Sequence, residues 1–145
     1  MKLAGTQTFS APRHKVWEFL IDPHRLSKCL PGCEKFEATG ENEYSAQLNV
    51  GLAAVKGIYN GKVKLDELQP PSHYKMLIDG KGKQGFIKGF GTLDLVEQGN
   101  ETVLTYSGDI QVGGPLASVG QRMIDGAAMM MIGQFFTALE AELRS

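Results

Sequence analysis

The chain has 145 residues with 15 basic and 16 acidic side chains, so its formal net charge at pH 7 is −1. This length fits one domain with a hydrophobic core of its own. The near-zero charge gives no electrostatic footprint for nucleic acid or for an anionic membrane surface, so neutral or apolar partners are favoured.

The amino-terminal part predicts a short strand followed by two helical segments. Apolar and polar residues alternate over residues 3–9, and Ser10 then gives a helix-start signal. Large apolar residues recur at helical spacing, and Pro23 begins a second, shorter helix that ends at the turn Pro31-Gly32. The terminus lacks the continuous apolar core of a signal peptide, so we expect a cytoplasmic protein.

Two cysteines, Cys29 and Cys33, enclose this turn. Their spacing is not the Cys-x-x-Cys of a redox dithiol, and the second pair or the histidines of a zinc site are missing. We interpret them as two ordinary thiols and predict no metal site. The alternative is a reversible disulfide or a metal held together with His24.

Six further strands are predicted in the middle of the chain, each with an apolar face that alternates with a polar one. They are expected at 34–39, 43–54, 58–68, 73–82, 86–97 and 102–112. The short connections between them imply an antiparallel meander. Glycines inside the strands indicate bends. Together with the first strand, these segments predict a seven-stranded curved antiparallel sheet.

A long helix is predicted at the end of the chain. Gly113-Gly114-Pro115 ends the strand-like sequence and opens a helical pattern from about 116 to 143. Its middle is apolar nearly all round, so we expect protein to cover most of it. No other helix is long enough to cover the apolar face of the sheet, which predicts one α+β domain over residues 1–145. Its apolar run is shorter than the roughly 20 residues that span a bilayer, which leaves only peripheral membrane contact open.

A sheet that bends around a helix encloses more volume than the helix fills, so we expect an apolar cavity between them. Methionine side chains adapt to varied apolar shapes and suit such a wall, although ordinary core packing explains them equally well. The predicted lining is Leu48, Val50, Tyr59, Met76, Phe90, Tyr106, Val119, Met123, Ala127, Met130, Met131 and Phe135. Which strand face points inward is left open by the pattern.

Arg122 and Asp125 are the predicted polar anchors of this cavity. They lie three residues apart on the last helix and therefore on neighbouring positions of one face. In the cavity mouth they would orient a ligand carbonyl. The alternative is an exposed local ion pair of little energetic consequence.

Five segments of the sequence carry a resemblance to a known family. They are residues 9–12 with Val16-Trp17, Cys29-Leu-Pro-Gly32, Gly57-x-Tyr59-x-Gly61, Gly80-Lys-Gly82, and residues 113–122. Together they resemble the G-subunit family of carbon monoxide dehydrogenase, within the helix-grip superfamily of START-like and polyketide-cyclase-like domains. The resemblance covers essentially the whole chain.

The resemblance implies a curved antiparallel sheet wrapped around the carboxy-terminal helix, with a deep apolar cavity and no cofactor. Members of the family are found beside molybdenum-containing hydroxylases. They are assigned to assembly or membrane attachment of those enzymes, or to carrying a hydrophobic molecule such as a quinone. Many continue past the last helix into a membrane-anchoring tail, whereas this sequence stops at Ser145, so direct membrane attachment is in doubt.

We therefore predict an accessory protein of a molybdenum hydroxylase that binds a quinone-like or lipid-like molecule. One alternative is a cyclase-like or hydrolase-like enzyme acting on a hydrophobic substrate in the same cavity. His14, His24 and His73 are expected at the surface, and nucleophile or phosphate motifs are lacking, so we assign no catalytic residue.

A second alternative is a docking or assembly factor that holds no ligand. Its apolar patch would come from Leu26, Leu30 and Phe36 around the cysteine loop. The segment from about residue 20 to 30 is also the expected gate of the cavity, because Pro23 and Pro31 bracket it as hinges.

Overall fold

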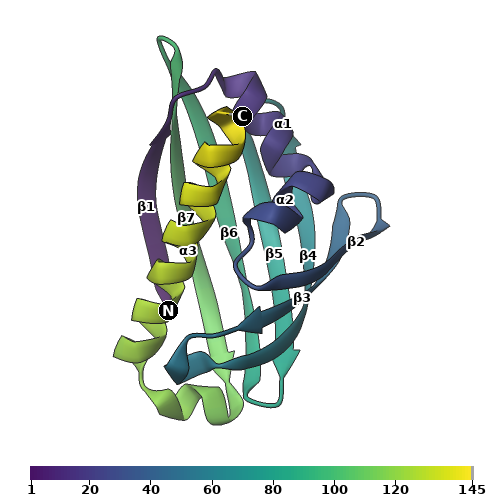
Figure 1. Cartoon of the computed structure of the whole chain (residues 1–145), viewed down its shortest axis with the longest axis vertical. Helices are drawn as coiled ribbons and strands as arrows, with labels where there is room; N and C mark the ends of the chain where they lie inside the picture. Colours follow the sequence, from purple (N-terminus) through teal and green to yellow (C-terminus); the bar gives the residue numbers. More distant parts are fainter. Residues whose placement is uncertain (145) are drawn as a thin grey trace.

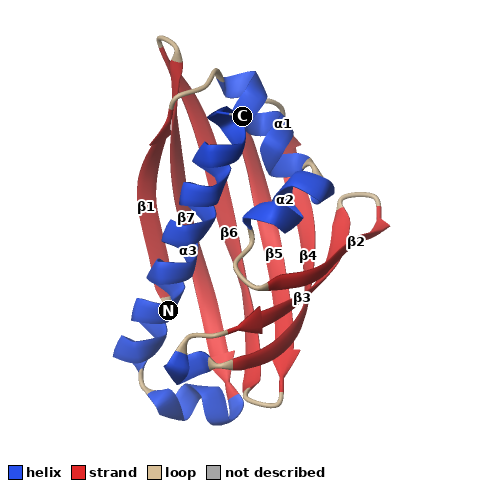
Figure 2. Cartoon of the chain, viewed as in Figure 1, coloured by secondary structure: helices blue, strands red, loops and turns tan. Residues whose placement is uncertain are grey.

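The computed structural model describes residues 1–144. In that range the chain forms seven strands, three α-helices and two short 3-10 helices, coloured along the sequence in Figure 1 and by type in Figure 2. In chain order these are β1 (Lys2–Phe9), α1 (Arg13–Ile21), α2 (Pro23–Cys29), β2 (Cys33–Gly40), β3 (Glu43–Val50), η1 (Ala53–Val55), β4 (Gly57–Gln69), β5 (His73–Gly82), β6 (Gly85–Gln98), β7 (Glu101–Gly113), η2 (Gly114–Val119) and α3 (Gln121–Arg144).

All seven strands form one antiparallel sheet in the order β1-β7-β6-β5-β4-β3-β2. Strands β2 to β6 each pair with the next strand along the chain, as short connections allow, and β7 pairs with β1 at the far edge. Figure 1 shows β2 and β3 curling over the face of the sheet that carries the helices. The predicted seven-stranded curved sheet is confirmed.

One predicted strand is too long. The alternating pattern predicted a strand over 43–54, whereas β3 ends at Val50 and is followed by η1. The N–H of Val55 donates to the Leu52 carbonyl at 3.0 Å, because the chain must turn there to enter β4. Every other predicted strand agrees with the structure to within one residue at each end.

The last helix begins later than predicted. The pattern from residue 116 onward is broken at Gly120, where the backbone φ is 103°. An α-helix cannot contain a residue with this φ, so the preceding residues form η2 instead and α3 starts at Gln121. The predicted continuous helix is therefore two helices of different type.

The main core lies between the sheet, α1 and the carboxy-terminal half of α3. Its largest fully buried apolar side chains are Phe9, Val16, Leu20, Leu104 and Leu139. The Lys15 ammonium donates to the Leu143 carbonyl at 2.8 Å, which ties the end of α3 to α1. Figure 1 shows the last turns of α3 beside α1. This end of α3 is held firmly by packing and by a hydrogen bond.

The amino-terminal half of α3 is packed much less. Met123 and Met130 are 55% and 52% exposed, and Met129 is also exposed. Met129 and Met130 lie in the apolar middle of the helix that protein was expected to cover, and for these two side chains the expectation is wrong. The sheet lies on one side of the helix only, so a segment that is apolar all round still leaves one face in solvent.

Candidate ligand-binding cavity

A cavity of about 370 Å³ lies between the inner face of the sheet and the helices. Its floor comes from all seven strands, and its cover from α3, from the end of α1, and from α2 with the loop that follows it. This volume falls in the range of small-molecule sites, roughly 300–1,000 Å³. The inner face is the one that carries Leu48 on β3, Val63 on β4 and Tyr106 on β7.

Five of the predicted side chains lie where the sequence placed them. Leu48, Met76 and Tyr106 line the floor, and Met131 and Phe135 line the cover. The strand positions follow from the period of two, because residues that alternate with exposed neighbours share one face. The two helical positions are four apart and therefore lie on one side of α3.

Phe90 borders the cavity but its ring lies on the outer face of the sheet. It pairs with Leu77 on β5 and alternates with Gly91, which faces Met76 across the strands. The ring is 44% exposed, and the Lys75 ammonium lies 4.9 Å from its centroid. The prediction that the Phe90 side chain lines the cavity is therefore wrong. The sequence did not show on which face of β6 Phe90 lies, because its neighbours Gly89 and Gly91 have no side chain that could mark the apolar face.

Val50, Tyr59 and Val119 form a separate cluster instead of the cavity wall. Val50 and Tyr59 are buried together with Leu116, and Val119 packs against them. The Tyr59 hydroxyl donates to the Val55 carbonyl at 2.7 Å, so its polar end is already satisfied. These residues close the end of the sheet near η1 and η2, beyond the cavity.

Met123 and Met130 lie on the outward side of α3, whereas Ala127 is half-buried on the side that carries Ile124 and Met131. Met123, Ala127 and Met130 are absent from the described wall, and the two methionines are exposed. Their prediction as lining residues is wrong. The helix starts only at Gln121, and its first turns are rotated so that Ile124 rather than Met123 faces the protein.

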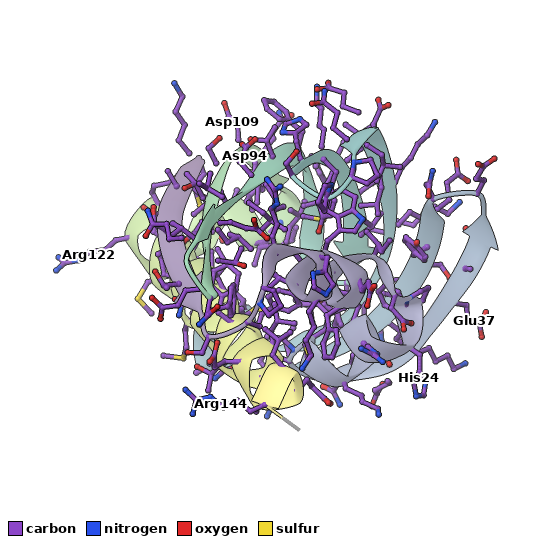
Figure 3. The ribbon with its side chains drawn as sticks, turned by 90° about the horizontal axis from the view of Figure 1, so that it is seen from above. His24, Glu37, Asp94, Asp109, Arg122 and Arg144 are labelled. Carbon is purple, nitrogen blue, oxygen red and sulfur yellow. The ribbon has the colours of Figure 1, made fainter. Side chains whose placement is uncertain are left out.

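The two predicted polar anchors do not reach the cavity. Arg122 is exposed, and Figure 3 shows its side chain pointing away from the molecule. Asp125 accepts a hydrogen bond from Gln121 at 2.8 Å rather than pairing with Arg122. The prediction that Arg122 and Asp125 anchor a ligand in the cavity is therefore wrong. The alternative, a local ion pair between the two side chains, is wrong as well.

Several wall residues were missed or were assigned another role. Leu26, Leu30 and Phe36, the predicted docking patch, line the cavity together with Leu20, Tyr44 and Tyr74. The loop that follows α2 folds inward, because α2 packs on both β2 and α3. Tyr44 shares the apolar face of β3, and Tyr74 precedes Met76 by two residues, so alternation could have identified both tyrosines.

The described wall contains no charged side chain. Its inward polar groups are the hydroxyls of Tyr44, Tyr74 and Tyr106, since Thr92 and Ser107 hydrogen-bond to one another on the outer face. The Tyr44 hydroxyl lies 3.4 Å from the Ile21 carbonyl. Burial raises the pKa of Tyr74, and the neighbouring Tyr44 raises it further. The cavity is therefore an apolar space with a few neutral hydrogen-bonding groups.

The histidines and cysteines lie outside this space. His14 and His24 are exposed, as Figure 3 shows for His24 on α2, and His73 lies on the outer face of the sheet beside Asp94. Cys29 and Cys33 are free thiols, and burial raises the pKa of each. Within residues 1–144, no group of three or more His, Cys, Asp or Glu is placed to hold a metal ion.

A curved antiparallel sheet wrapped around a long carboxy-terminal helix, with a cavity between them, defines a helix-grip protein. The sequence model of the carbon monoxide dehydrogenase G subunit (CoxG) matches residues 5–144, and the chain belongs to this family. The family predicted from the sequence is thereby confirmed. Among the described residues, no helix is both long and apolar enough to cross a membrane.

Several solved structures share this fold. A crystal structure of a conserved protein from Geobacillus kaustophilus is 39% identical, with a TM-score of 0.97 over 99% of this chain and 95% of that chain. A START superfamily protein from Mycobacterium smegmatis is 13% identical, with a TM-score of 0.78 over 99% and 97% of the two chains. The Zhui aromatase/cyclase from Streptomyces sp. R1128 is 17% identical, with a TM-score of 0.73 over 99% and 93%. A search of the curated proteins found no match.

Proposed function

We propose that this protein binds a hydrophobic small molecule in the cavity between the sheet and α3. The observation that carries the proposal is the cavity itself, which is apolar, of ligand size, and lined without charged side chains in the described part of the chain. Enclosed apolar pockets with a few polar groups are the usual form of small-molecule sites. Burial of the apolar ligand surface would supply the main binding free energy.

The biological role that we propose is that of an accessory protein for a molybdenum hydroxylase of the carbon monoxide dehydrogenase type. Membership of the CoxG family supports this role. The ligand would be a quinone-like or lipid-like molecule that the protein carries, and the protein itself would need no cofactor. Co-purification of a molybdenum hydroxylase with the tagged protein tests the association, and its absence from the native host's eluate would contradict it.

Binding without chemistry accounts best for the residues on the wall. General acid or base catalysis requires a group that exchanges a proton near the working pH. The polar groups facing the cavity are tyrosine hydroxyls, and burial raises the pKa of Tyr44 and Tyr74, so both stay protonated. A cyclase-like or hydrolase-like activity would have to operate without a carboxylate, imidazole or thiol on the described wall.

A docking role has a separate observation in its favour. Met123, Met129 and Met130 form an exposed apolar stretch on the outward side of α3. Exposed methionines are common on surfaces that accept apolar partners. This stretch replaces the cysteine loop as the candidate contact surface for a partner enzyme.

The test of ligand binding compares tryptophan substitutions at two adjacent positions of α3. Met131 lines the cavity, whereas Met130 points into solvent. Gently purified wild type and Met130→Trp should carry a stoichiometric apolar molecule in native mass spectrometry. Met131→Trp should lose it, because the larger ring fills the cavity. Organic extraction then identifies the molecule.

Thermal unfolding of each variant checks that the fold is kept, and Leu48→Phe on the opposite wall provides a second filling variant. Protein that purifies without a bound molecule, and takes up neither a quinone nor a lipid, would contradict binding. The docking role would then be favoured.

A further inference from the structure

Tyr74 is a buried residue of the cavity wall that carries a hydroxyl. Tyr74 is 4% exposed and lies on the cavity wall, on the inner face of β5. Its ring packs against Trp17, with 5.6 Å between the ring centroids, and pairs across the strands with buried Leu93. These rigid neighbours fix the ring, so the direction of its hydroxyl is set by the fold and not by a ligand.

This hydroxyl has no partner in the protein. Within residues 1–144 it makes no hydrogen bond, whereas the neighbouring Tyr44 hydroxyl is within 3.4 Å of the Ile21 carbonyl. Among the described residues, the buried side-chain atoms that lack a hydrogen-bond partner are Arg13 Nε and Gln84 Oε1, so the Tyr74 oxygen is not sealed in the core and can be reached from the cavity. A ligand that covered this O–H without offering an acceptor would leave it unpaired, which costs free energy. The fold keeps this group at the wall of an otherwise apolar space, where a ligand atom can satisfy it.

The protonation state of Tyr74 decides which ligand atom fits. Burial raises its pKa, as does the nearby Tyr44, so the group is a neutral donor at physiological pH. A donor requires an acceptor, and a carboxylate is disfavoured because no charged side chain on the described wall would compensate its charge. A plain hydrocarbon would leave the hydroxyl unpaired.

Resting on the binding function proposed above, we infer that Tyr74 determines the specificity of the cavity. Its hydroxyl donates a hydrogen bond to a neutral acceptor oxygen, such as a carbonyl, of an otherwise apolar ligand. The cavity thereby selects neutral carbonyl compounds over hydrocarbons and over carboxylic acids of the same length.

Three probes of equal chain length separate these ligand classes: 2-undecanone, undecane and undecanoic acid at pH 7.5. Trp17 is the only tryptophan and touches Tyr74, so its fluorescence reports binding directly. Wild type should bind the ketone about three- to tenfold more tightly than the alkane, as one hydrogen bond predicts. Tyr74→Phe should lose this preference while its affinity for the alkane is unchanged or higher.

Tyr59→Phe is the matched control, because the Tyr59 hydroxyl donates to the Val55 carbonyl in the cluster outside the cavity. It should keep the preference for the ketone. Tyr106→Phe removes a second hydroxyl of the wall, one that is not held by a backbone carbonyl as Tyr44 is, and should also keep the preference. A preference that survives Tyr74→Phe, or that disappears in Tyr106→Phe instead, would overturn the assignment of Tyr74.

Two further outcomes separate this inference from the proposed function. Equal binding of ketone and alkane, or tightest binding of the acid, would overturn the role of Tyr74 and leave hydrophobic binding standing. Failure of all three probes to bind protein that unfolds cooperatively would contradict both the inference and the binding function.

Discussion

His73 is held between two carboxylates on the outer face of the sheet, away from the cavity. Its Nδ1 lies 2.8 Å from Asp94 Oδ1, and its Nε2 lies 3.5 Å from Glu67 Oε1. The hydrogen bond to Asp94 is the largest cause and raises the pKa of His73, whereas burial, the second largest, lowers it. The charge of Asp94 and the hydrogen bond and charge of Glu67 raise the pKa further, so the net shift is upward. The imidazolium form is thus favoured by the folded state.

This arrangement makes part of the stability depend on pH. Because the folded pKa of His73 lies above its ordinary value of 6.5, its stabilising contribution is complete below that value. It is lost as the pH rises through the raised folded pKa. In urea unfolding, His73→Gln should therefore destabilise the protein more at about pH 5.5 than at about pH 8.5. An equal loss at both pH values would show that His73 acts by packing alone.

Two other residues show how single side chains position the cavity. The buried Thr102 hydroxyl donates to the Ala11 carbonyl at 2.7 Å and fixes the crossing from β1 to α1. Gly5 leaves room for the ring of Tyr106, since a Cβ at Gly5 would lie 2.4 Å from the Tyr106 hydroxyl oxygen. Tyr106 then packs on Phe136 of α3, with 5.6 Å between centroids. A small residue on β1 therefore sets the position of an aromatic ring on the cavity wall.

At the scale of elements, α3 has two halves with different surroundings. Phe136, Leu139 and Leu143 are buried in the main core, whereas only Ile124 is buried among the described residues of the first three turns. Gly126 and Gly133 have open space where a Cβ would lie, so neither glycine is required by close packing. The helix is anchored at its carboxy-terminal end and covers the cavity with the adjoining turns.

Alanine substitutions along α3 should reproduce this division. Leu139→Ala should lower the free energy of unfolding by about 2–5 kcal/mol, because it empties a fully buried site. Met130→Ala should change it by no more than about 0.5 kcal/mol, because its side chain is half in solvent. Urea titrations of both variants measure the difference. Comparable losses would mean that the outward face of α3 is covered in solution.

The segment containing α2 is the element that sequence reasoning proposed as a gate. It contributes Leu26, Leu30 and Pro31 to the cavity wall, so its displacement would open the cavity. One end is fixed, since the Asn49 N–H donates to the Gly32 carbonyl at 2.8 Å. Gly32 has a φ of 73°, and a Cβ there would lie 2.1 Å from the Asn49 carbonyl oxygen, so the turn requires glycine. Its opening stays a prediction.

At the scale of the whole molecule, the charged side chains lie away from the described wall of the cavity. The chain carries a net charge of −1, and the cavity wall described above is uncharged. A neutral ligand should therefore bind with little dependence on ionic strength, because no ion pair is formed that salt could screen.

The affinity for 2-undecanone should change less than about twofold between 50 and 500 mM sodium chloride. The same ligand should raise the melting temperature in proportion to the logarithm of its concentration once the site is filled. Titration by Trp17 fluorescence at several salt concentrations measures the first effect, and calorimetry measures the second. A steep fall of affinity with salt would indicate that a charged group takes part in binding.

Local signals in the sequence were enough to predict the family, the seven strands, the meander and the presence of a long final helix. Alternation fixes the strand faces, and short turns fix the antiparallel order. The same alternation placed Leu48, Met76 and Tyr106 on the cavity wall. It failed at Phe90, because glycines on both sides erased the contrast between the two faces.

The covered side of α3 and the proximity of Tyr44 to Tyr74 depend instead on tertiary packing. A helix that is apolar all round gives no preferred face, so its rotation depends on where it starts and on how it docks. The left-handed backbone at Gly120 sets that start, and burial of Leu139 sets the docking. Tyr44 and Tyr74 come from strands that are not neighbours in the sheet, so their proximity depends on the curl of the whole sheet, which no local pattern encodes.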